Sequence, residues 1–547
     1  MSIEVSLGAS AEAAQEVKER LVAEGVPAAL AAGDPALWGP DAEAEASIRL
    51  GWLNLHETSR ELLPRLTELA ERVRAGGIDT IVLAGMGGSS LAPEVICATA
   101  DVPLTVLDTT DPHQVRRALG PGDGSADVLR RTLVVVASKS GTTIETDSHR
   151  RIYEKAFENA GLDPAEHIVV VTDPGSPLHR LAEESRYEVV LADPNVGGRY
   201  SALSAFGLVP SALAGADVAR LLDEAAQVRP LLAQNEGNPG LELGALLGAE
   251  ALRGRDKLIL RDEPSEITSL PDWIEQLIAE STGKDGKGIL PVVGADAAEA
   301  SDQYQVTIGP EAGAFVDGPL GAQFLVWEYA TAIAGRVIGI DPFNQPNVAE
   351  SKENTARLLK EAGDGPLPTG RPILVDGPVE VYGDVPGHPK DLADVLTWLL
   401  KSLPPQGYLA IMAYLDREAA FDAAAVGEAS FEETAEAWAA ADIATLRGLL
   451  DHRTDRPVTF GWGPRFLHST GQYHKGGPQN GVFLQITGAV TDDIEVPGKP
   501  YTLGRLQLAQ ALGDLRALTS RGRPAVRLHL TDRVAGVRHV LSAAKEL

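Results

Sequence analysis

The sequence contains almost no cysteine: Cys97 is the only one in 547 residues. One thiol cannot form an internal disulfide, and it cannot supply the thiolate cluster of a structural metal site. Long apolar runs are missing as well, because no stretch approaches the ~18 apolar residues of a membrane helix. The first residues also lack the basic start and apolar core of a signal peptide. We therefore expect a cytoplasmic protein with no membrane partner.

Positive charge is scarce too. The 48 Lys and Arg residues are outnumbered by 77 Asp and Glu residues, which gives a formal net charge of −29. Binding to nucleic acid depends on surplus basic side chains, so no nucleic-acid partner is expected. An anionic small molecule would approach against the mean field of the protein. Its site must therefore be made locally positive by helix dipoles and a few Lys or Arg side chains.

Strand and helix patterns alternate from residue 79 onward, and a second alternating block begins near Leu241. Such alternation is typical of doubly wound parallel sheets. The sequence predicts an α/β protein with two sugar-isomerase-like, flavodoxin-like domains and an acidic, Ala-rich helical run at 419–446. The predicted division is a helical arm at 1–77, a first domain at 78–240, and a second domain at 241–547 with an extra segment at about 366–455.

Two turns rich in Gly, Ser and Thr follow strands of the first block. Residues 133–137 are typical of a strand buried on both faces, and SKSGTT at 138–143 follows them directly before a helix. Unpaired N–H groups and the helix dipole favour an anion there. GMGGSS at 85–90 holds a similar position but lacks the spacing of a dinucleotide or nucleotide loop. We interpret 138–143 as a phosphate-monoester site, with hydroxyls that only cap the helix as the alternative.

Three charged side chains stand in unusual local settings. Arg199 follows two glycines after a predicted strand, where its guanidinium and the Gly198 N–H could reach one ligand oxygen. Glu280 shares a helix face with Gln276 and lies near the negative end of the helix dipole, which disfavours a carboxylate. Lys352 lies near a helix N-terminus, where the dipole disfavours a cation. Solvated side chains are the alternative in each case, and a base in a cleft is the functional interpretation of Glu280.

A Gly-rich loop at 467–481 carries His468 and His474. Their six-residue separation does not match the spacing of metal ligands on a helix, and no Cys or carboxylate cluster adjoins them. No metal site is therefore expected. Two solvated loop histidines are the alternative to a role in proton transfer.

Together these motifs resemble the phosphoglucose isomerase family, over roughly residues 78–360 and the loop near 468. Five stretches carry the resemblance. GMGGSSLAP at 85–93 resembles the family's Gly-Gly-Ser signature, SKSGTTIET at 138–146 its phosphate loop, and GGRYSALSAFGL at 197–208 its second glycine signature. WIEQLIAESTGKDGKG at 273–288 resembles the catalytic-glutamate stretch, and DPFNQPNVAESK at 341–352 the bacterial segment with the active-site lysine.

The resemblance implies an enzyme that interconverts glucose 6-phosphate and fructose 6-phosphate through a cis-enediol, as a homodimer and without metal or cofactor. It implies Glu280 as the base between the first two sugar carbons, Arg199 facing the enediolate, and Lys352 near the ring oxygen. It further implies that His468 opens the ring with His474 assisting. The implied substrate contacts are Gly88, Ser89, Ser138, Lys139, Ser140, Thr142, Thr143, Gly198, Gln276 and His474.

One departure from the family concerns the ring-opening histidine. In bacterial relatives an LHS-x-GQ segment closely follows the glutamate motif, but residues 298–304 hold no His here. LHSTGQ at 467–472 matches the missing motif after Lys352, an order that resembles the isomerase half of fused transaldolase–isomerase proteins. Two alternatives stay open: a dual phosphoglucose/phosphomannose isomerase, and a regulator that binds sugar phosphates without catalysis.

Overall fold

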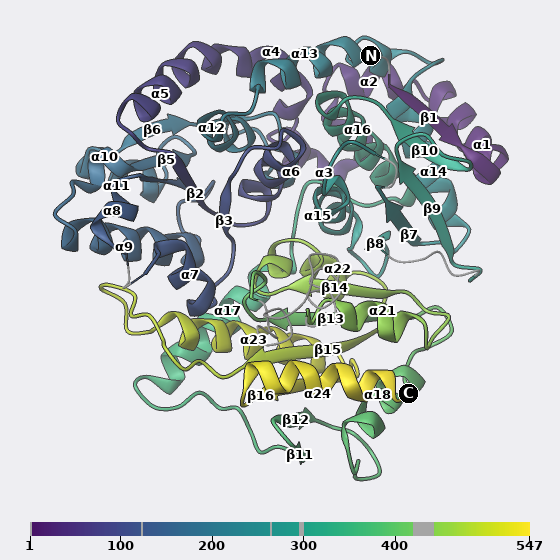
Figure 1. The fold of residues 1–547 in the computed structure, drawn as a ribbon. Coiled ribbons are helices and arrows are strands. Elements are labelled where there is room, and N and C mark those ends of the chain that lie inside the picture. The colour runs from purple at the N-terminus through teal and green to yellow at the C-terminus, as the bar shows by residue number, and fades with distance from the viewer. Residues whose placement is uncertain (1–2, 122–123, 263–264, 295–299, 420–441) are drawn as a thin grey trace, which may run out of the picture.

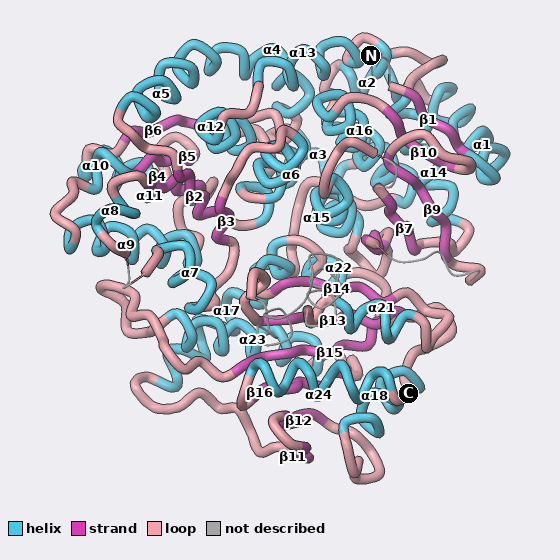
Figure 2. Tube along the Cα trace, viewed as in Figure 1, coloured by secondary structure: helices cyan, strands magenta, loops and turns pink. Residues whose placement is uncertain are grey.

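The computed structural model describes residues 3–547 except 122–123, 263–264, 295–299 and 420–441. Within these residues the strands form three sheets, the first at upper left, the second at upper right and the third below (Figure 1). Figure 2 shows the same three groups of strands. The expected α/β class with parallel sheets is confirmed. Most of the helical run expected at 419–446 lies outside the described residues.

The N-terminal arm begins with a strand and continues as helices. Strand β1 (Glu4–Leu7) pairs antiparallel with a strand of the second sheet. The helices carry their apolar residues at three- and four-residue spacing, so each buries one face against the sheets' covering helices. They are α1 (Ala11–Ala23), α2 (Val26–Ala31), α3 (Pro40–Ala46), α4 (Leu55–Thr58) and α5 (Leu63–Ala75).

The first sheet is entirely parallel, in the order β3-β2-β4-β5-β6. Its strands are β2 (Thr80–Gly85), β3 (Thr105–Leu107), β4 (Thr132–Ala137), β5 (Ile168–Thr172) and β6 (Glu188–Leu191). The helices after them are α6 (Leu91–Thr99), α7 (Pro112–Leu119), α8 (Ala126–Leu129), α9 (Ile144–Asn159), α10 (Pro164–His167), α11 (Pro177–Ser185), α12 (Ala205–Ala214) and α13 (Val218–Val228).

Alternate residues of β4 enter two different cores. Leu133 and Val135 join a core that also holds α12, whereas Val134 and Val136 join a core with α9 and α11. Both faces of the sheet are thus covered, which explains the continuous apolar run. Gly85 pairs with Ala137 in the register of β2 and β4. The two polar turns that follow these residues therefore leave the same edge of the sheet, as the sequence predicts.

The second sheet has the order β1-β10-β9-β7-β8 and is parallel except for β1. Its other strands are β7 (Lys257–Arg261), β8 (Leu290–Val293), β9 (Gln303–Ile308) and β10 (Ala314–Asp317). Its helices are α14 (Pro239–Leu252), α15 (Leu270–Thr282), α16 (Leu320–Ile338) and α17 (Val348–Ala362). The arm and the first two sheets share one large apolar core, and α16, buried at all but two of its residues, passes through it.

A third sheet accounts for the remainder of the chain, in the order β11-β12-β16-β15-β13-β14. Its strands are β11 (Leu374–Asp376), β12 (Val379–Gly383), β13 (Tyr408–Tyr414), β14 (Val458–Trp462), β15 (Gly481–Gly488) and β16 (Ala525–Leu530), and its helices are α18 (Leu392–Lys401), α21 (Thr445–Asp451), α22 (Gly471–Gly476), α23 (Leu503–Thr519) and α24 (Arg533–Lys545). The region expected as one second domain thus carries two sheets. The division into domains itself stays a prediction.

The third sheet packs against the second through one of its two faces. Ala410, Met412 and Phe483 on that face share a core with Ile259 and Leu290 of the second sheet. The opposite face forms a core of its own with α18, α21 and α24. Among the described residues, no helix combines the length and the apolar character needed to cross a membrane.

Candidate active site

The turn after β4 is held together by its own hydroxyl groups. Ser138 Oγ donates to Thr143 Oγ1 at 3.0 Å, and the Gly141 N–H donates to Ser138 Oγ at 3.2 Å. The hydroxyls of Ser140 and Thr142 lie 2.9 Å apart. Thr143 stands at the N-cap of α9, yet its side chain makes no capping hydrogen bond. Helix capping therefore does not account for the Thr143 hydroxyl.

Positive charge reaches this turn from neighbouring segments. Arg150 and Lys499 line a cavity of about 480 Å³ that adjoins the turn, and both also pair with Asp147. Lys139 lies in the turn itself, but its Nζ lies 2.6 Å from Asp173 Oδ2. Burial lowers the pKa of Lys139 from its ordinary value, although the Asp173 carboxylate opposes this shift. The Lys139 side chain is thus committed to Asp173 rather than to the turn.

The glycine turns are placed where side chains would collide. Gly88 and Ser89 belong to the 3₁₀ turn Gly87–Ser89. A Cβ on Gly88 would lie 2.0 Å from the Gly198 carbonyl oxygen. Gly87 has φ +53, and its Cβ would lie 2.8 Å from both Gln276 Nε2 and the His468 carbonyl oxygen. Positions 87 and 88 must therefore be glycine, because a side chain at either would prevent the close approach of the second glycine turn, α15 and the His468 segment.

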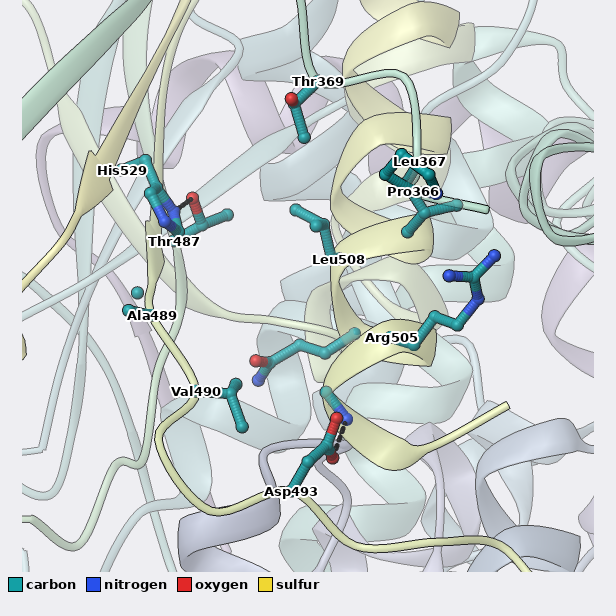
Figure 3. A pocket seen from close by; sticks show the side chains of 13 residues that line it. Pro366, Leu367, Thr369, Thr487, Ala489, Val490, Asp493, Arg505, Leu508 and His529 are labelled. Atoms are coloured by element: carbon teal, nitrogen blue, oxygen red, sulfur yellow. Dashed lines mark hydrogen bonds between the residues drawn. The ribbon is translucent and has the colours of Figure 1, made fainter. Parts of the chain in front are cut away.

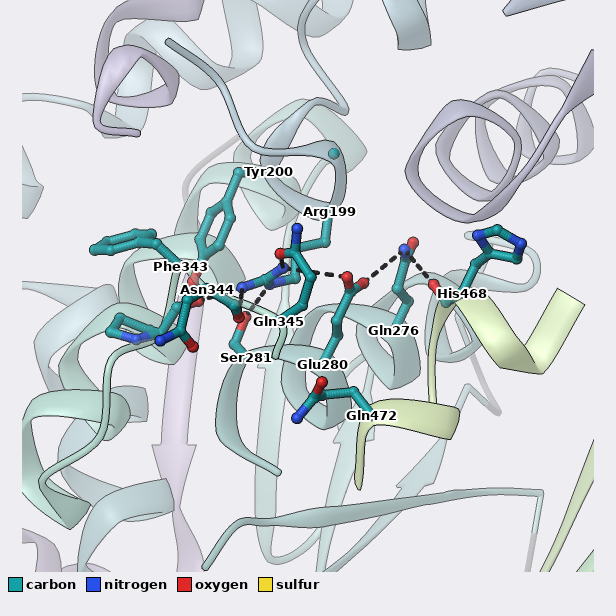
Figure 4. A network of polar contacts seen from close by, with 12 residues as sticks. Arg199, Tyr200, Gln276, Glu280, Ser281, Phe343, Asn344, Gln345, His468 and Gln472 are labelled. Atoms are coloured by element: carbon teal, nitrogen blue, oxygen red, sulfur yellow. Dashed lines mark hydrogen bonds and ion pairs between the residues drawn. The ribbon is translucent and has the colours of Figure 1, made fainter. Parts of the chain in front are cut away.

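Glu280 and Gln276 project from one face of α15 toward the segment that contains His468 (Figure 4). Gln276 Nε2 donates to Glu280 Oε2 at 3.0 Å and to the His468 carbonyl oxygen at 2.8 Å. Glu280 is only 8% exposed, so its carboxylate is not a solvated helix-end charge. The four-residue spacing predicts this shared face, whereas the contact with His468 arises only in the folded protein.

Arg199 lies against the other oxygen of the same carboxylate. Its Nη1 is 3.3 Å from Glu280 Oε1, and the side chain is 2% exposed. The guanidinium also donates to Ser281 Oγ at 2.7 Å and to Gln345 Oε1 at 2.9 Å, as well as to two backbone carbonyls of the 342–344 turn (Figure 4). Five contacts on a buried planar cation fix its position relative to Glu280.

His468 ends a short 3₁₀ helix, Arg465–His468, that follows the carboxyl end of β14. Its Nε2 lies 3.0 Å from Oε1 of Glu145 in the first turn of α9. Burial alone would raise the pKa of Glu145, but the charge and hydrogen bond of His468, with help from the backbone and Lys352, lower it to about 2. Glu145 is therefore ionised near neutral pH, and an ionised carboxylate can only accept, so His468 Nε2 carries a hydrogen.

Lys352, in the second turn of α17, shares a cavity of about 200 Å³ with Glu145 and His468, whereas Glu280 and Arg199 are not among its lining residues. The polar side chains around that cavity come from the turn after β4, from α9, α17 and α23, and from the 3₁₀ helix after β14. They are Thr142, Thr143, Glu145, Ser351, Lys352, Thr355, His468 and Gln510. Thr142 and Thr143 of the hydroxyl-rich turn, the Glu145–His468 pair and Lys352 therefore face one cavity.

His474 lies apart from this arrangement. Its ring is 3% exposed, stacks on Tyr408 and packs among Phe466 and Phe483. Its Nδ1 lies 3.0 Å from the Tyr408 hydroxyl, and burial lowers its pKa well below the ordinary value. A role for His474 in the site stays a prediction that no contact with His468 or the cavity supports.

A separate cavity of about 400 Å³ opens at the carboxyl ends of β15 and β16 (Figure 3). Asp493 accepts hydrogen bonds there from the Gly504 N–H and the Thr502 hydroxyl at the start of α23. A carboxylate of the chain thus already takes the position that an anion would occupy at this helix N-terminus.

Four residues of the site are not predicted from the sequence: Glu145, Ser281, Gln345 and Gln510. Glu145 stands inside the phosphate motif, where an acidic residue at a helix start needs no further explanation. Gln345 and Ser281 stand inside other motifs, next to singled-out residues. Gln510 lies mid-helix in α23, far from any motif, and only its spatial contact with Glu145 identifies it.

The fold and these contacts define a class of protein: an α/β protein with mostly parallel sheets, in which a carboxylate–guanidinium pair and a histidine–carboxylate pair lie near a hydroxyl-rich turn. The family model for phosphoglucose isomerase matches residues 45–289, just under half of the chain. That stretch holds the phosphate turn, Arg199 and Glu280. Lys352 and His468 lie beyond it.

Named relatives are glucose-6-phosphate isomerases. A probable enzyme of this name from Haloarcula marismortui is 36% identical over 232 residues, which is 42% of this chain and 52% of the relative. One from Rubrobacter xylanophilus is 29% identical over 57% of this chain and 90% of the relative. A crystal structure of one from Chlamydia trachomatis matches with a TM-score of 0.49 at 24% identity, over 55% of this chain and 74% of that one. The chain thus spans about half the length of the first relative. The family model and these two sequence relatives show its similarity to the phosphoglucose isomerase family.

Proposed function

We propose that the protein interconverts glucose 6-phosphate and fructose 6-phosphate. The observation that carries this proposal is a continuous path of contacts from the reacting carboxylate to the phosphate turn. It runs from Glu280 through Gln276 to the His468 backbone, and from the His468 ring to Glu145, two residues after Thr143. A sugar phosphate in the adjoining cavity would thereby have its phosphate end and its reacting carbons held by one rigid set of groups.

The phosphate supplies binding energy away from the reacting carbons. The hydroxyls of Ser138, Ser140, Thr142 and Thr143 can each donate to a phosphate oxygen, and the N-terminal end of α9 favours the negative charge. In the structure these hydroxyls bond to one another. Binding then exchanges those bonds for bonds to phosphate.

The cyclic sugar opens first. His468 Nε2 is committed to Glu145, so Nδ1 is the nitrogen that exchanges a proton with the substrate. As an imidazolium, His468 gives this proton to the ring oxygen O5 while the O1 hydroxyl loses its proton to solvent, and the C1–O5 bond breaks to leave an aldehyde. Lys352, on the same cavity, provides a cation near the departing O5.

Isomerisation follows on the open chain. Glu280 removes the hydrogen of C2 as a proton, the electron pair forms the C1–C2 double bond, and O1 takes up a proton, which yields the cis-enediol. Glu280 returns its proton to C1 while O2 loses a proton and becomes the ketone oxygen. Arg199, beside Glu280, stabilises charge that develops on these oxygens, and one such donor contributes about 3 kcal/mol.

The direct test measures conversion of fructose 6-phosphate to glucose 6-phosphate, coupled to a dehydrogenase that consumes the product and reduces NADP. We expect turnover in the wild type and its loss by orders of magnitude in Glu280→Gln, with sugar-phosphate binding retained. A wild type that binds the sugar phosphate without turnover would reject the proposal and leave the non-catalytic alternative.

Three finer points rest on the resemblance. We propose that the chain forms a homodimer, that it acts in the cytoplasm, and that its motif order matches the isomerase half of transaldolase–isomerase fusions. The order of Glu280, Lys352 and His468 along the chain supports the last point. Sedimentation equilibrium at the mass of two chains would support the first, and a single-chain mass at micromolar concentration would reject it.

A further inference from the structure

A glutamine from the third sheet is bound to the pair that holds the ring-opening histidine. Gln510 lies in α23 and is 2% exposed. Its Nε2 donates to Glu145 Oε1 at 2.7 Å, the same oxygen that contacts His468 Nε2 at 3.0 Å. One carboxylate oxygen thus receives two donors, one from the amide and one from the imidazole.

The orientation of this amide is fixed from its other side. Thr110, which is fully buried in the loop before α7, donates its hydroxyl to Gln510 Oε1 at 2.7 Å. A glutamine that accepts from Thr110 must present its NH₂ group to Glu145. Thr110, Gln510 and Glu145 therefore form a one-way chain of donors that ends on the carboxylate.

Burial makes this arrangement consequential. Glu145 is 3% exposed, and a buried carboxylate without donors is strongly disfavoured. Other titratable groups that act on Glu145 are Lys352 from α17, His149 one turn further along α9, and the hydroxyls of Tyr414 and Tyr501. Within the described residues, the side-chain hydrogen bonds to Glu145 Oε1 come from Gln510 and His468. Loss of the Gln510 amide would therefore leave the His468 imidazole as the one remaining side-chain partner of that oxygen.

We infer that Gln510, oriented by Thr110, is a positioning residue that fixes the Glu145 carboxylate and thereby the ring and tautomer of His468 for ring opening. This inference rests on the proposed function and extends it. It also gives the third sheet a task beyond carrying His468, because α23 supplies the second donor to the carboxylate that fixes His468. The isomerisation at Glu280 does not depend on this contact.

The test compares a substrate that must open with one that cannot close. Glucose 6-phosphate is largely cyclic. A 4,5-dideoxy analogue has no hydroxyl that can form a five- or six-membered ring, so it enters as the open chain. We expect Gln510→Met, which is similar in shape but cannot donate, to lower kcat on glucose 6-phosphate about tenfold to hundredfold. Turnover of the analogue should change by less than about twofold, since it bypasses the positioned group.

A matched control lies one turn earlier on the same helix. Gln507 Nε2 donates to Asp111 Oδ2, which also accepts a hydrogen bond from Arg533 Nη1. Among the hydrogen bonds of the described residues, none joins Gln507 to Glu145 or His468. Gln507→Met should loosen the same inter-sheet contact without changing the ratio of the two rates. If Gln507→Met changes the ratio as much as Gln510→Met does, the effect is general loosening and the inference is overturned.

A second pair of variants covers the case in which Gln510→Met does not fold. Gln510→Glu can donate to Glu145 only while protonated, so its rate on glucose 6-phosphate, relative to wild type, should fall as pH rises. Thr110→Val frees the amide to turn and should lower the same rate, whereas Thr110→Ser should restore it. A Gln510→Glu ratio that does not vary with pH, or equal losses on both substrates, would reject the positioning role.

These outcomes are separable from the fate of the proposed function. Wild-type turnover of both substrates, abolished by Glu280→Gln, establishes the isomerase regardless of Gln510. Wild-type inactivity on both substrates rejects the function, and with it the role of Gln510.

Discussion

The Nε2 atom of His468 lies 3.0 Å from Oε1 of Glu145, although 323 residues separate the two along the chain. Glu145 lies in the first turn of α9, which follows a strand of the first sheet, and His468 follows a strand of the third. This contact joins the phosphate turn to the segment whose carbonyl oxygen binds Gln276, and so to Glu280. The proposed chemistry depends on this junction, and each prediction below probes one part of it.

Glu280→Gln should abolish isomerisation of both cyclic and open-chain substrate, because the amide cannot accept a proton from C2. Glu275→Gln on the same helix is the matched control. Burial, reinforced by the charge of Asp272, raises the pKa of Glu275 to about 8, so this side chain is mostly neutral near pH 7 and the amide imitates it. We expect near wild-type kcat for Glu275→Gln in the coupled assay. Equal losses in the two variants would contradict the role of Glu280 as base.

His468→Gln should lower kcat on glucose 6-phosphate about a hundredfold or more, as expected for loss of a general acid, and spare the 4,5-dideoxy analogue. His474→Phe should instead lower the thermal midpoint, since it leaves the Tyr408 hydroxyl without its partner, and keep the ratio of the two rates. Differential scanning calorimetry and paired kinetics separate these effects. A changed ratio for His474→Phe would restore His474 to the ring-opening step.

Arg199→Lys should lower kcat about a hundredfold to a thousandfold with a smaller change in KM, because a lysine cannot reproduce a planar, five-contact cation beside Glu280. Arg220→Lys is the control, since the Arg220 side chain is largely exposed where it pairs with Glu224 and should tolerate the exchange. An unchanged kcat for Arg199→Lys would show that any nearby cation suffices.

Gly141→Ala should raise KM for sugar phosphates and leave the relative rates of the two substrates unchanged. Gly141 has φ +67, and an added Cβ would lie 2.7 Å from the Leu178 N atom, so the phosphate turn must shift. Isothermal titration with fructose 6-phosphate measures the loss of affinity. Gly161→Ala, also at positive φ but with open space around the Cβ, controls for the backbone effect. Unchanged affinity in Gly141→Ala would place the phosphate elsewhere.

The ion pair of Glu145 should also be visible in stability. The pKa of this carboxyl is lowered to about 2 in the folded protein. Its stabilising contribution is therefore complete above the ordinary pKa of a glutamate and disappears as pH falls from about 4.5 toward 2. The free energy of unfolding by urea should exceed that of Glu145→Gln at pH 6, and the difference should shrink on acidification. A difference that is constant from pH 6 to pH 3 would contradict an ionised Glu145.

The sequence by itself determined the local units of this protein. Residues 132–147 form a strand, a hydroxyl-rich turn and a helix because apolar runs, glycine and helix starts act over a few residues. Gln276 and Glu280 share a face because a helix repeats every 3.6 residues, and the turns at 85–90 and 138–143 share an edge because parallel strands end together. Each of these relationships is set by neighbours in the chain or in one ladder.

Only the tertiary structure decided how these units meet. It placed strands β11 to β16 in a third sheet, brought His468 and Gln510 to Glu145, and enclosed His474 among aromatic rings. His468 and His474 lie six residues apart in a segment predicted to be one loop and carry the same local signal, yet the first lines the cavity and the second, in α22, is part of the core. The physical reason is that burial and close packing are decided by which distant surfaces fit together, and no local pattern encodes that fit.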